Sequence, residues 1–262
     1  MVLFFDALGA FLLARLEEVG RYFRLVWWAA IAPLRRPLHL KEVMQQMEFV
    51  GVQSTAIIAL TGTFTGMVFA LQTGHAFRTF GADTLVGGTS VLALVRELGP
   101  VLAALMVTGR AGSAMASELA TMRVTEQIDA LDVMAADPVK LLIWPRLAAG
   151  VVMVPALTVI FNFVGSVGSY LVATSVLNLA PGEWWKNVYE LVEVDDVMKG
   201  IVKAVVFGFI MASVGCYKGY FARGGARGVG RATTDSVVYA SVLILISDYF
   251  ITAYQLNFAN MG

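Results

Sequence analysis

Five apolar stretches of the sequence constrain the fold more than any other feature, because each has roughly the length of a membrane span. A helix needs about 20 residues to cross the hydrocarbon core of a bilayer, which is about 30 Å thick. The stretches are Phe49–Gln72, Thr84–Gly109, Leu147–Pro181, Val197–Tyr217 and Ser236–Phe258. The third is too long for one straight span, and we expect it to break near Asn178–Gly182. The sequence therefore predicts an all-α membrane protein with five transmembrane helices.

The composition supports this class and disfavours several others. Hydrophobic residues make up 58% of the 262 positions, charged residues make up 15%, and the mean hydropathy is +0.73. Soluble domains average about 45–50% apolar and about 25% charged residues. Nineteen basic and nineteen acidic residues cancel, so the net charge is uninformative about partners. For a membrane protein of this kind we expect no nucleic-acid partner. The single Cys216 and the distant His39 and His75 form no ligand spacing, so we expect neither a metal nor another cofactor.

The basic residues predict the orientation of the spans. The amino-terminal region, the second connector and the fourth connector contain six, four and four Lys or Arg residues. The first connector, the third connector and the tail contain one, two and none. Loops rich in Lys and Arg remain in the cytoplasm. We therefore expect a cytoplasmic amino terminus and a periplasmic carboxyl terminus, with the protein in the bacterial inner membrane.

Residues 1–46 form an amino-terminal region that is too charged to span a bilayer. Apolar side chains recur every three or four positions and predict one helical stripe, formed by Phe4, Leu8, Leu12, Leu16, Val19, Phe23 and Val26. Charged side chains occupy the other side of this helix, and the pair Trp27-Trp28 follows it. This pattern predicts a helix that lies in the membrane interface, and a soluble helix packed on a partner remains an alternative. Pro33 and Pro37 then separate it from a second short helix, Leu38–Met47. We expect residues 47–262 to form the five-span domain.

The adjacent charges Arg96-Glu97 lie in the middle of the second apolar stretch, where ionised groups are costly. Neighbouring helix positions do not face each other, so each charge needs another partner. Lys203 and Asp248, in the fourth and fifth stretches, are the available candidates. Two interpretations remain: the pair lines a polar opening for a headgroup or ion, or it only braces the bundle.

The segment Glu126–Ala136 has an amphipathic pattern between the second and third spans. Its apolar residues share one side with Val124, and its acidic residues Glu126, Asp129 and Asp132 cluster on another. This pattern predicts either a solvated connector or a cytoplasmic docking helix. The third connector, which begins with Trp184-Trp185, is typical of a short amphipathic helix at the outer face.

Small residues recur at the spacing that lets membrane helices approach closely, in the pairs Gly62 and Gly66, Gly112 and Ala116, and Gly165 and Ser169. They can serve packing within one subunit or a dimer seam. The segment Gly225–Ala232 resembles a phosphate-binding loop but lacks its Lys and its Ser or Thr. We expect a flexible basic loop there and no ATP binding.

Several motifs resemble the MlaE family, the permease subunits of bacterial lipid ABC transporters of the MCE type. The matching text is RELGPVLAAL from Arg96, GRAGSA around Arg110, MRVTEQIDAL from Met122, MAADP from Met134 and GVGRATT from Gly228. The resemblance covers about residues 40–258.

This resemblance implies a homodimer that moves phospholipid and binds it in a cavity between the two permeases. It implies a separate cytoplasmic ABC ATPase, a periplasmic MCE-domain protein and, in some members, a STAS-domain protein. By position, the residues near lipid would be Phe69, Phe77, Phe80, Arg96, Glu97, Leu98 and Lys203. The cytoplasmic coupling helix between spans 2 and 3 would contact the ATPase through Glu126, Gln127, Asp129, Leu131, Met134 and Asp137.

Two alternative functions, each in a different class of protein, compete with that of an ABC transporter permease. A proton-coupled secondary transporter would use Glu97 and Asp248, but no inverted repeat is visible in the sequence. An intramembrane enzyme would use Ser113 as its nucleophile, but neither histidine lies at a depth where it could act as the base. We therefore expect a transport subunit and not an enzyme.

Overall fold

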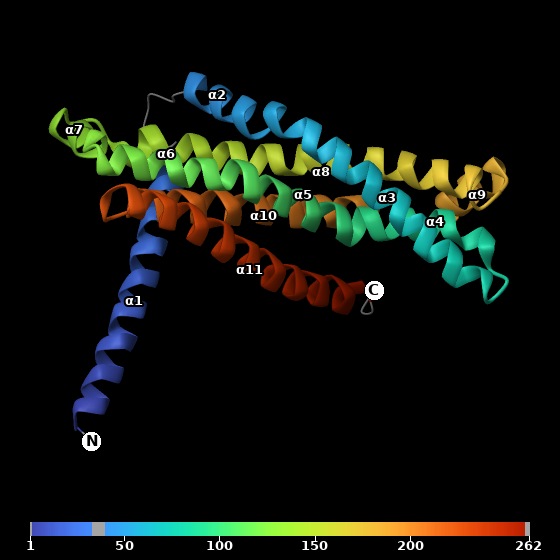
Figure 1. The fold of residues 1–262 in the computed structure, drawn as a ribbon, viewed down its shortest axis with the longest axis horizontal. Helices are drawn as coiled ribbons and strands as arrows, with labels where there is room; N and C mark the ends of the chain where they lie inside the picture. Colours follow the sequence, from blue (N-terminus) through green and yellow to red (C-terminus); the bar gives the residue numbers. More distant parts are fainter. Residues whose placement is uncertain (1, 33–39, 260–262) are drawn as a thin grey trace.

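The computed structural model describes residues 2–32 and 40–259, and every regular element within these ranges is helical. Figure 1 shows an elongated bundle from which α1 and the end of α11 diverge. Five helical stretches in the described ranges are long and apolar enough to span a membrane, namely Leu40–Arg78, Asp83–Val124, Val139–Ser175, Val194–Tyr220 and Gly225–Asn257. The five predicted spans are therefore confirmed as helices of sufficient length.

The amino-terminal helix α1 (Val2–Ile31) crosses the long axis of the bundle and meets it only near its carboxyl end (Figure 1). Leu25 and Ala29 are buried there, whereas Leu16, Val19 and Phe23 of the predicted stripe are exposed. The side chains of Phe4, Leu8 and Leu12, and the residues Pro33 and Pro37, lie outside the described part of the chain. Helix formation is thus confirmed, and the position of α1 in the membrane interface stays a prediction.

The first span consists of two helices joined without a loop. The predicted second short helix is α2 (Leu40–Val50), and the 3-10 turn η2 (Val52–Ser54) connects it to α3 (Thr55–Arg78). The close packing of Gly51 explains the junction, because a Cβ at this position would lie 1.9 Å from the Met153 side chain.

The second span is longer than the sequence suggested. It contains η3 (Asp83–Leu85), α4 (Val86–Ala93), η4 (Leu94–Leu98), α5 (Gly99–Val107), η5 (Thr108–Gly112) and α6 (Ser113–Val124). A helix of these 42 residues is roughly 63 Å long, about twice the hydrocarbon thickness. We expected the span to end at Gly109. It continues because Arg110 remains in the helix and donates hydrogen bonds to Phe49 O (2.6 Å) and Ser54 Oγ (2.9 Å).

The third apolar stretch breaks close to the expected position. The short α7 (Gln127–Val133) and η6 (Val139–Ile143) lead into α8 (Trp144–Ser175), and an irregular segment then precedes α9 (Pro181–Leu191). Helix α9 confirms the predicted amphipathic helix of the third connector. Its Trp184 is buried and contacts the Tyr170 ring of α8 edge-on, at 5.2 Å between ring centroids.

The last two spans are α10 (Val194–Tyr220) and α11 (Gly225–Ala259). The prediction of a flexible basic loop at Gly225–Ala232 is wrong, because these residues form the first turns of α11. Ala232 is buried with Ala120 and Ala222, and Gly228 lies against the Arg223 backbone, which only a residue without a side chain permits. Tertiary packing here overrides the low helix propensity of glycine.

Glycines let the spans pack at close range within one chain. A Cβ on Gly66 of α3 would lie 1.9 Å from the Gly165 carbonyl oxygen of α8, and a Cβ on Gly208 of α10 would lie 2.3 Å from the Gly150 carbonyl oxygen of α8. A Cβ on Gly215 would similarly approach Gly112. These contacts show that the small-residue patterns at Gly62, Gly112 and Gly165 serve packing within one subunit, and a dimer seam stays a prediction.

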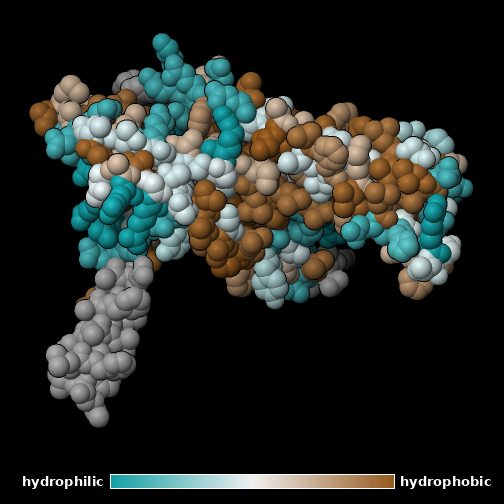
Figure 2. All heavy atoms as spheres, in the orientation of Figure 1, coloured by the Kyte–Doolittle hydropathy of each residue, from teal (hydrophilic) through white to brown (hydrophobic). Residues whose placement is uncertain are grey.

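The surface has the polarity of a membrane protein. Figure 2 shows hydrophobic residues over the middle of the bundle and hydrophilic residues concentrated toward both ends. The hydrophilic end near α7 includes the basic residues of the second and fourth connectors.

Candidate functional site

A π-helical turn places the charged pair of the second span. The turn η4 (Leu94–Leu98) contains Arg96 and Glu97 and is followed directly by Pro100 in the first turn of α5. Proline has no N–H to donate to the carbonyl four residues earlier, and its ring crowds that carbonyl. This explains why the α-helical pattern is interrupted at this point, and such π-turns are frequent at functional sites.

Glu97, Lys203 and Asp248 meet in one charge cluster between η4, α10 and α11. The Lys203 ammonium donates a hydrogen bond to Glu97 Oε2 and lies 3.0 Å from Asp248 Oδ1. It also lies 2.6 Å from Thr252 Oγ1, whose hydroxyl donates to the Asp248 carbonyl oxygen at 2.8 Å. The expectation that Lys203 is a partner of the charged pair is confirmed, whereas Asp248 pairs with Lys203 and not with Arg96 or Glu97. Thr252 carried no signal in the sequence that distinguished it.

Arg96 has a partner that sequence reasoning missed. Its Nε lies 3.6 Å from Asp196 Oδ1 in the first turn of α10. Asp196 directly precedes the predicted span Val197–Tyr217 and was not considered as a partner, although a carboxylate at the start of a span can pair with a cation in the neighbouring span. Asp196 also caps α10, because its Oδ2 accepts a hydrogen bond from the Glu193 backbone N–H. Arg96 and Glu97 therefore have separate partners.

The burial of Lys203 makes the cluster energetically sensitive. Its side chain is 0% exposed, whereas that of Glu97 is 40% exposed. A buried cation needs carboxylate partners, and removal of one member of a buried pair leaves an uncompensated charge. One lysine here neutralises one of two carboxylates, so the three side chains have a formal net charge of −1. Glu97 is the member that an approaching ligand could reach.

A cavity of about 480 Å³ lies beside this cluster, between α3 and η4. Its walls include Phe69 and Leu98 of the expected lipid-binding residues, together with Phe64, Thr65, Val68 and Gln72. Leu98 follows Glu97 directly, so the cavity and the charge cluster use neighbouring residues of η4, although no side chain of the cluster lines the cavity. The other two expected aromatic residues lie farther along, Phe77 in the last turn of α3 and Phe80 beyond its end, and they are not part of this wall.

The predicted coupling residues lie in α7 or next to its ends, and they differ in exposure. Leu131 is half-buried, while Glu126, Gln127, Asp129 and Met134 are exposed. Asp129 pairs with Arg123 at 2.6 Å, and Asp137 Oδ1 accepts hydrogen bonds from the backbone N–H groups of the next turn. Asp137 thus has a structural role in starting η6.

The apolar residues in and next to α7 are partly buried in the bundle and partly exposed. Ile128 is fully buried, whereas Val133 is 88% exposed and Met134 is 67% exposed. Val133 was not among the predicted coupling residues, because a strict helical stripe does not include it. The helix ends at Val133, and Ala135 has a left-handed backbone with φ of 56°.

Comparisons with known proteins agree with the resemblance found in the sequence. The family described as Permease MlaE matches residues 43–254. A probable ABC transporter permease protein of Rickettsia felis is 44% identical over 90% of this chain and 91% of its own length. The intermembrane phospholipid transport system permease protein MlaE of Haemophilus influenzae is 36% identical over 97% of both chains. The chloroplastic protein TRIGALACTOSYLDIACYLGLYCEROL 1 of Arabidopsis thaliana is 37% identical over 84% of this chain and 63% of its own length. This chain therefore belongs to the MlaE permease family.

Proposed function

We propose that the protein is the membrane subunit of an ATP-driven transporter that binds phospholipid in the cavity between α3 and η4. The observation that carries this proposal is a largely apolar cavity whose wall includes Leu98 of η4, the same turn that contributes Glu97 to the buried charge cluster. Apolar walls with a few polar groups are typical of ligand sites. The phospholipid transport name of the Haemophilus relative supports the ligand class.

In this proposal Phe69 and Leu98 contact acyl chains, and Arg96 and Glu97 lie near the headgroup. Arg96 is partly exposed and can contact a phosphate while it remains close to Asp196. Lys203 is fully buried, so we assign it to holding Glu97 and Asp248 in place rather than to direct contact. Phe77 and Phe80 would meet lipid nearer the outer end of α3.

The cavity is open on one side of the single chain, and we propose that a second copy closes it in a homodimer. The proposed topology places α7 in the cytoplasm, where Val133 and Met134 form an exposed apolar tip suited to an ABC ATPase. The opposite, periplasmic end with α9 would face an MCE-domain protein, and a STAS-domain protein would join on the cytoplasmic side. The inner membrane is the location that this topology requires.

The rival functions receive less support. Lys203 forms ion pairs with both proposed proton carriers, Glu97 and Asp248, which gives these carboxylates a structural role that requires no proton transfer. Ser113 donates its hydroxyl to the backbone carbonyls of Gly109 and Arg110, which is an ordinary arrangement within a helix. Membership of a permease family also favours transport over catalysis.

Phospholipid retained by the purified chain tests this function. We expect Val68→Trp, which fills the cavity, to lose most of the copurifying phospholipid that mass spectrometry detects in the wild-type protein. Val152→Trp is the matched control, because both valines are about half exposed on spanning helices and only Val68 lines the cavity. Equal phospholipid content in the two variants would exclude the α3–η4 cavity as the lipid site.

A further inference from the structure

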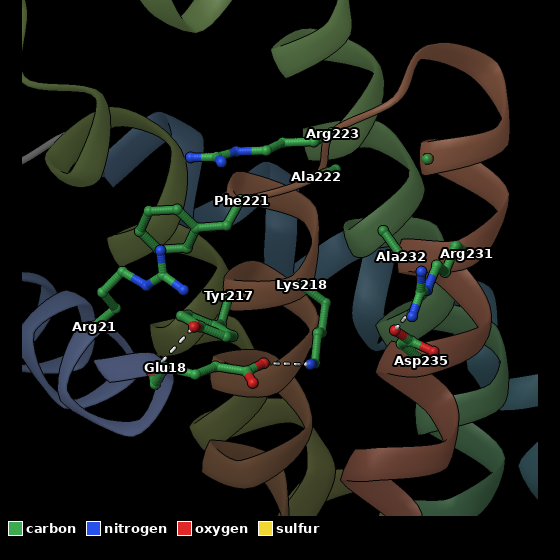
Figure 3. A pocket seen from close by; sticks show the side chains of 11 residues that line it. Glu18, Arg21, Tyr217, Lys218, Phe221, Ala222, Arg223, Arg231, Ala232 and Asp235 are labelled. Carbon is green, nitrogen blue, oxygen red and sulfur yellow. Dashed lines mark hydrogen bonds and ion pairs between the residues drawn. The ribbon is translucent and has the colours of Figure 1, made fainter. Parts of the chain in front are cut away.

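A second cavity, polar in character, lies at the basic end of the bundle and shares no residue with the charge cluster. It measures about 250 Å³ and is formed by α1, α11 and the end of α10 (Figure 3). Its lining contains four cations, Arg21, Lys218, Arg223 and Arg231, and two carboxylates, Glu18 and Asp235. We refer to it as the basic cavity. Its excess of positive charge indicates an anionic ligand.

Three of the four cations retain capacity for a ligand. Lys218 is committed, since its Nζ lies 3.1 Å from Glu18 Oε1 and 4.1 Å from the centre of the Tyr239 ring. Arg231 is highly exposed, and its Nε lies 3.8 Å from Asp235 Oδ2. An exposed ion pair at this distance contributes little to stability in water. Arg223 is exposed and has no ion pair among the described residues.

Arg21 adds an unsatisfied donor to the wall of the same cavity. Its guanidinium lies over the Phe221 ring at 5.9 Å and forms a loose ion pair with Glu17 at 3.8 Å, and its Nε is buried without a hydrogen-bond partner in the described part of the chain. Buried donors in native proteins are nearly always paired. A phosphate group supplies several acceptor oxygens, and arginine binds it with two parallel hydrogen bonds.

An apolar groove adjoins the basic cavity and favours a lipid over a free anion. The groove measures about 400 Å³ and shares Glu18, Tyr217 and Lys218 with the basic cavity. The rest of its lining is hydrophobic or aromatic: Val19, Tyr22, Phe23, Val214, Tyr239 and Leu243. A free phosphate would leave this groove unfilled, whereas an anionic phospholipid presents a phosphate and an acyl chain together.

We propose that the basic cavity and the apolar groove together bind one anionic phospholipid of the surrounding leaflet, distinct from the lipid that is transported. Its phosphate lies in the basic cavity, whose lining includes Arg21, Arg223 and Arg231, and an acyl chain lies along Phe23 and Leu243. Such a lipid would join α1 to α10 and α11. Under the proposed topology the site lies in the cytoplasmic leaflet, which is the anionic one.

A photoreactive phosphatidylglycerol with a diazirine in one acyl chain tests this site in the full-length protein. After illumination, peptide mapping locates the crosslinks. We expect crosslinks on α1 and on the basic ends of α10 and α11, and phosphatidylcholine with the same diazirine should give far fewer. Peptide mapping distinguishes crosslinks at this site from crosslinks at the α3–η4 cavity. If no crosslinks form at this site, the proposed transport function is therefore not affected.

Matched variants sharpen the test. The double variant Arg223→Gln/Arg231→Gln should weaken phosphatidylglycerol crosslinking, by about fivefold for each arginine that is removed. Arg227→Gln removes an exposed charge from the same helix end without touching the cavity, and should have little effect. Leu243→Trp should block the groove, whereas Leu245→Trp, at another exposed leucine of α11 outside the groove, should not.

Three results would overturn the proposal. An equal loss in Arg227→Gln would show general attraction to a basic surface. Displacement of the probe by inorganic phosphate, with full crosslinking in Leu243→Trp, would identify a free anion as the ligand. The absence of crosslinks on α1, α10 and α11 would show that no lipid binds there.

Discussion

At the scale of single residues, the central feature is a lysine that two carboxylates share inside the membrane-spanning bundle. The sequence indicated Glu97, Lys203 and Asp248, because charge in an apolar stretch requires partners. It could not indicate Thr252 or Asp196. A threonine is unremarkable in a membrane helix, and the contact of Asp196 with Arg96 depends on how η4 and α10 align.

Lys203→Met should destabilise the protein far more than the loss of a surface lysine. Two carboxylates then share a site without a cation, and removing one side of a buried pair costs about 3–5 kcal/mol. Lys199→Met is the control, because Lys199 pairs with the exposed Asp195 and such pairs contribute about 1 kcal/mol or less. Thermal unfolding in detergent measures both variants.

The triple variant Lys203→Met/Glu97→Gln/Asp248→Asn separates charge from packing. Because it removes all three charges, it should recover much of the thermal stability that Lys203→Met loses. If the triple variant unfolds at the same temperature as the single variant or below it, the interpretation of Lys203 as a counter-charge is incorrect.

At the scale of helices, periodicity and composition predicted the elements better than their ends. The five spans, the break before α9 and the helix α9 itself followed from apolar length, proline and amphipathic pattern. The extension of the second span beyond Gly109 did not, because Arg110 is accommodated by contacts with the distant Phe49 and Ser54. The helical start of α11 at Gly225 likewise depends on burial of Ala232 that no local pattern reveals.

Gly66→Ala should destabilise the crossing of α3 and α8. Glycine to alanine in an exposed helix normally stabilises by about 0.5–1 kcal/mol. At Gly66 the added Cβ would meet the Gly165 backbone at 1.9 Å, so the helices must separate. Gly230→Ala in α11 is the control, since a Cβ there has no neighbour within 4 Å. Thermal midpoints should fall for Gly66→Ala and stay equal or rise for Gly230→Ala. A rise in both would contradict the close crossing.

At the scale of the whole molecule, the helices place a cavity and a buried charge cluster within the bundle and an exposed apolar tip at its basic end. Composition alone indicates a membrane protein, and the family follows from motifs around Arg96 and Met122. The cavity could not be predicted, since Phe69 of α3 and Leu98 of η4 line it together only after folding. The same holds for Val133, whose exposure depends on where α7 ends.

ATP-dependent lipid movement tests the account most directly. The complex is purified from native membranes through a tag on this chain and reconstituted into vesicles that contain a fluorescent phospholipid. We expect lipid movement that requires ATP hydrolysis and that Val133→Asp/Met134→Asp abolishes while the variant retains its copurifying phospholipid. Val194→Asp, at a similarly exposed valine of the opposite end, should leave the copurifying ATPase and its ATP hydrolysis unchanged. Movement that proceeds without ATP and collapses when a protonophore is added would contradict the account and favour a proton-coupled transporter.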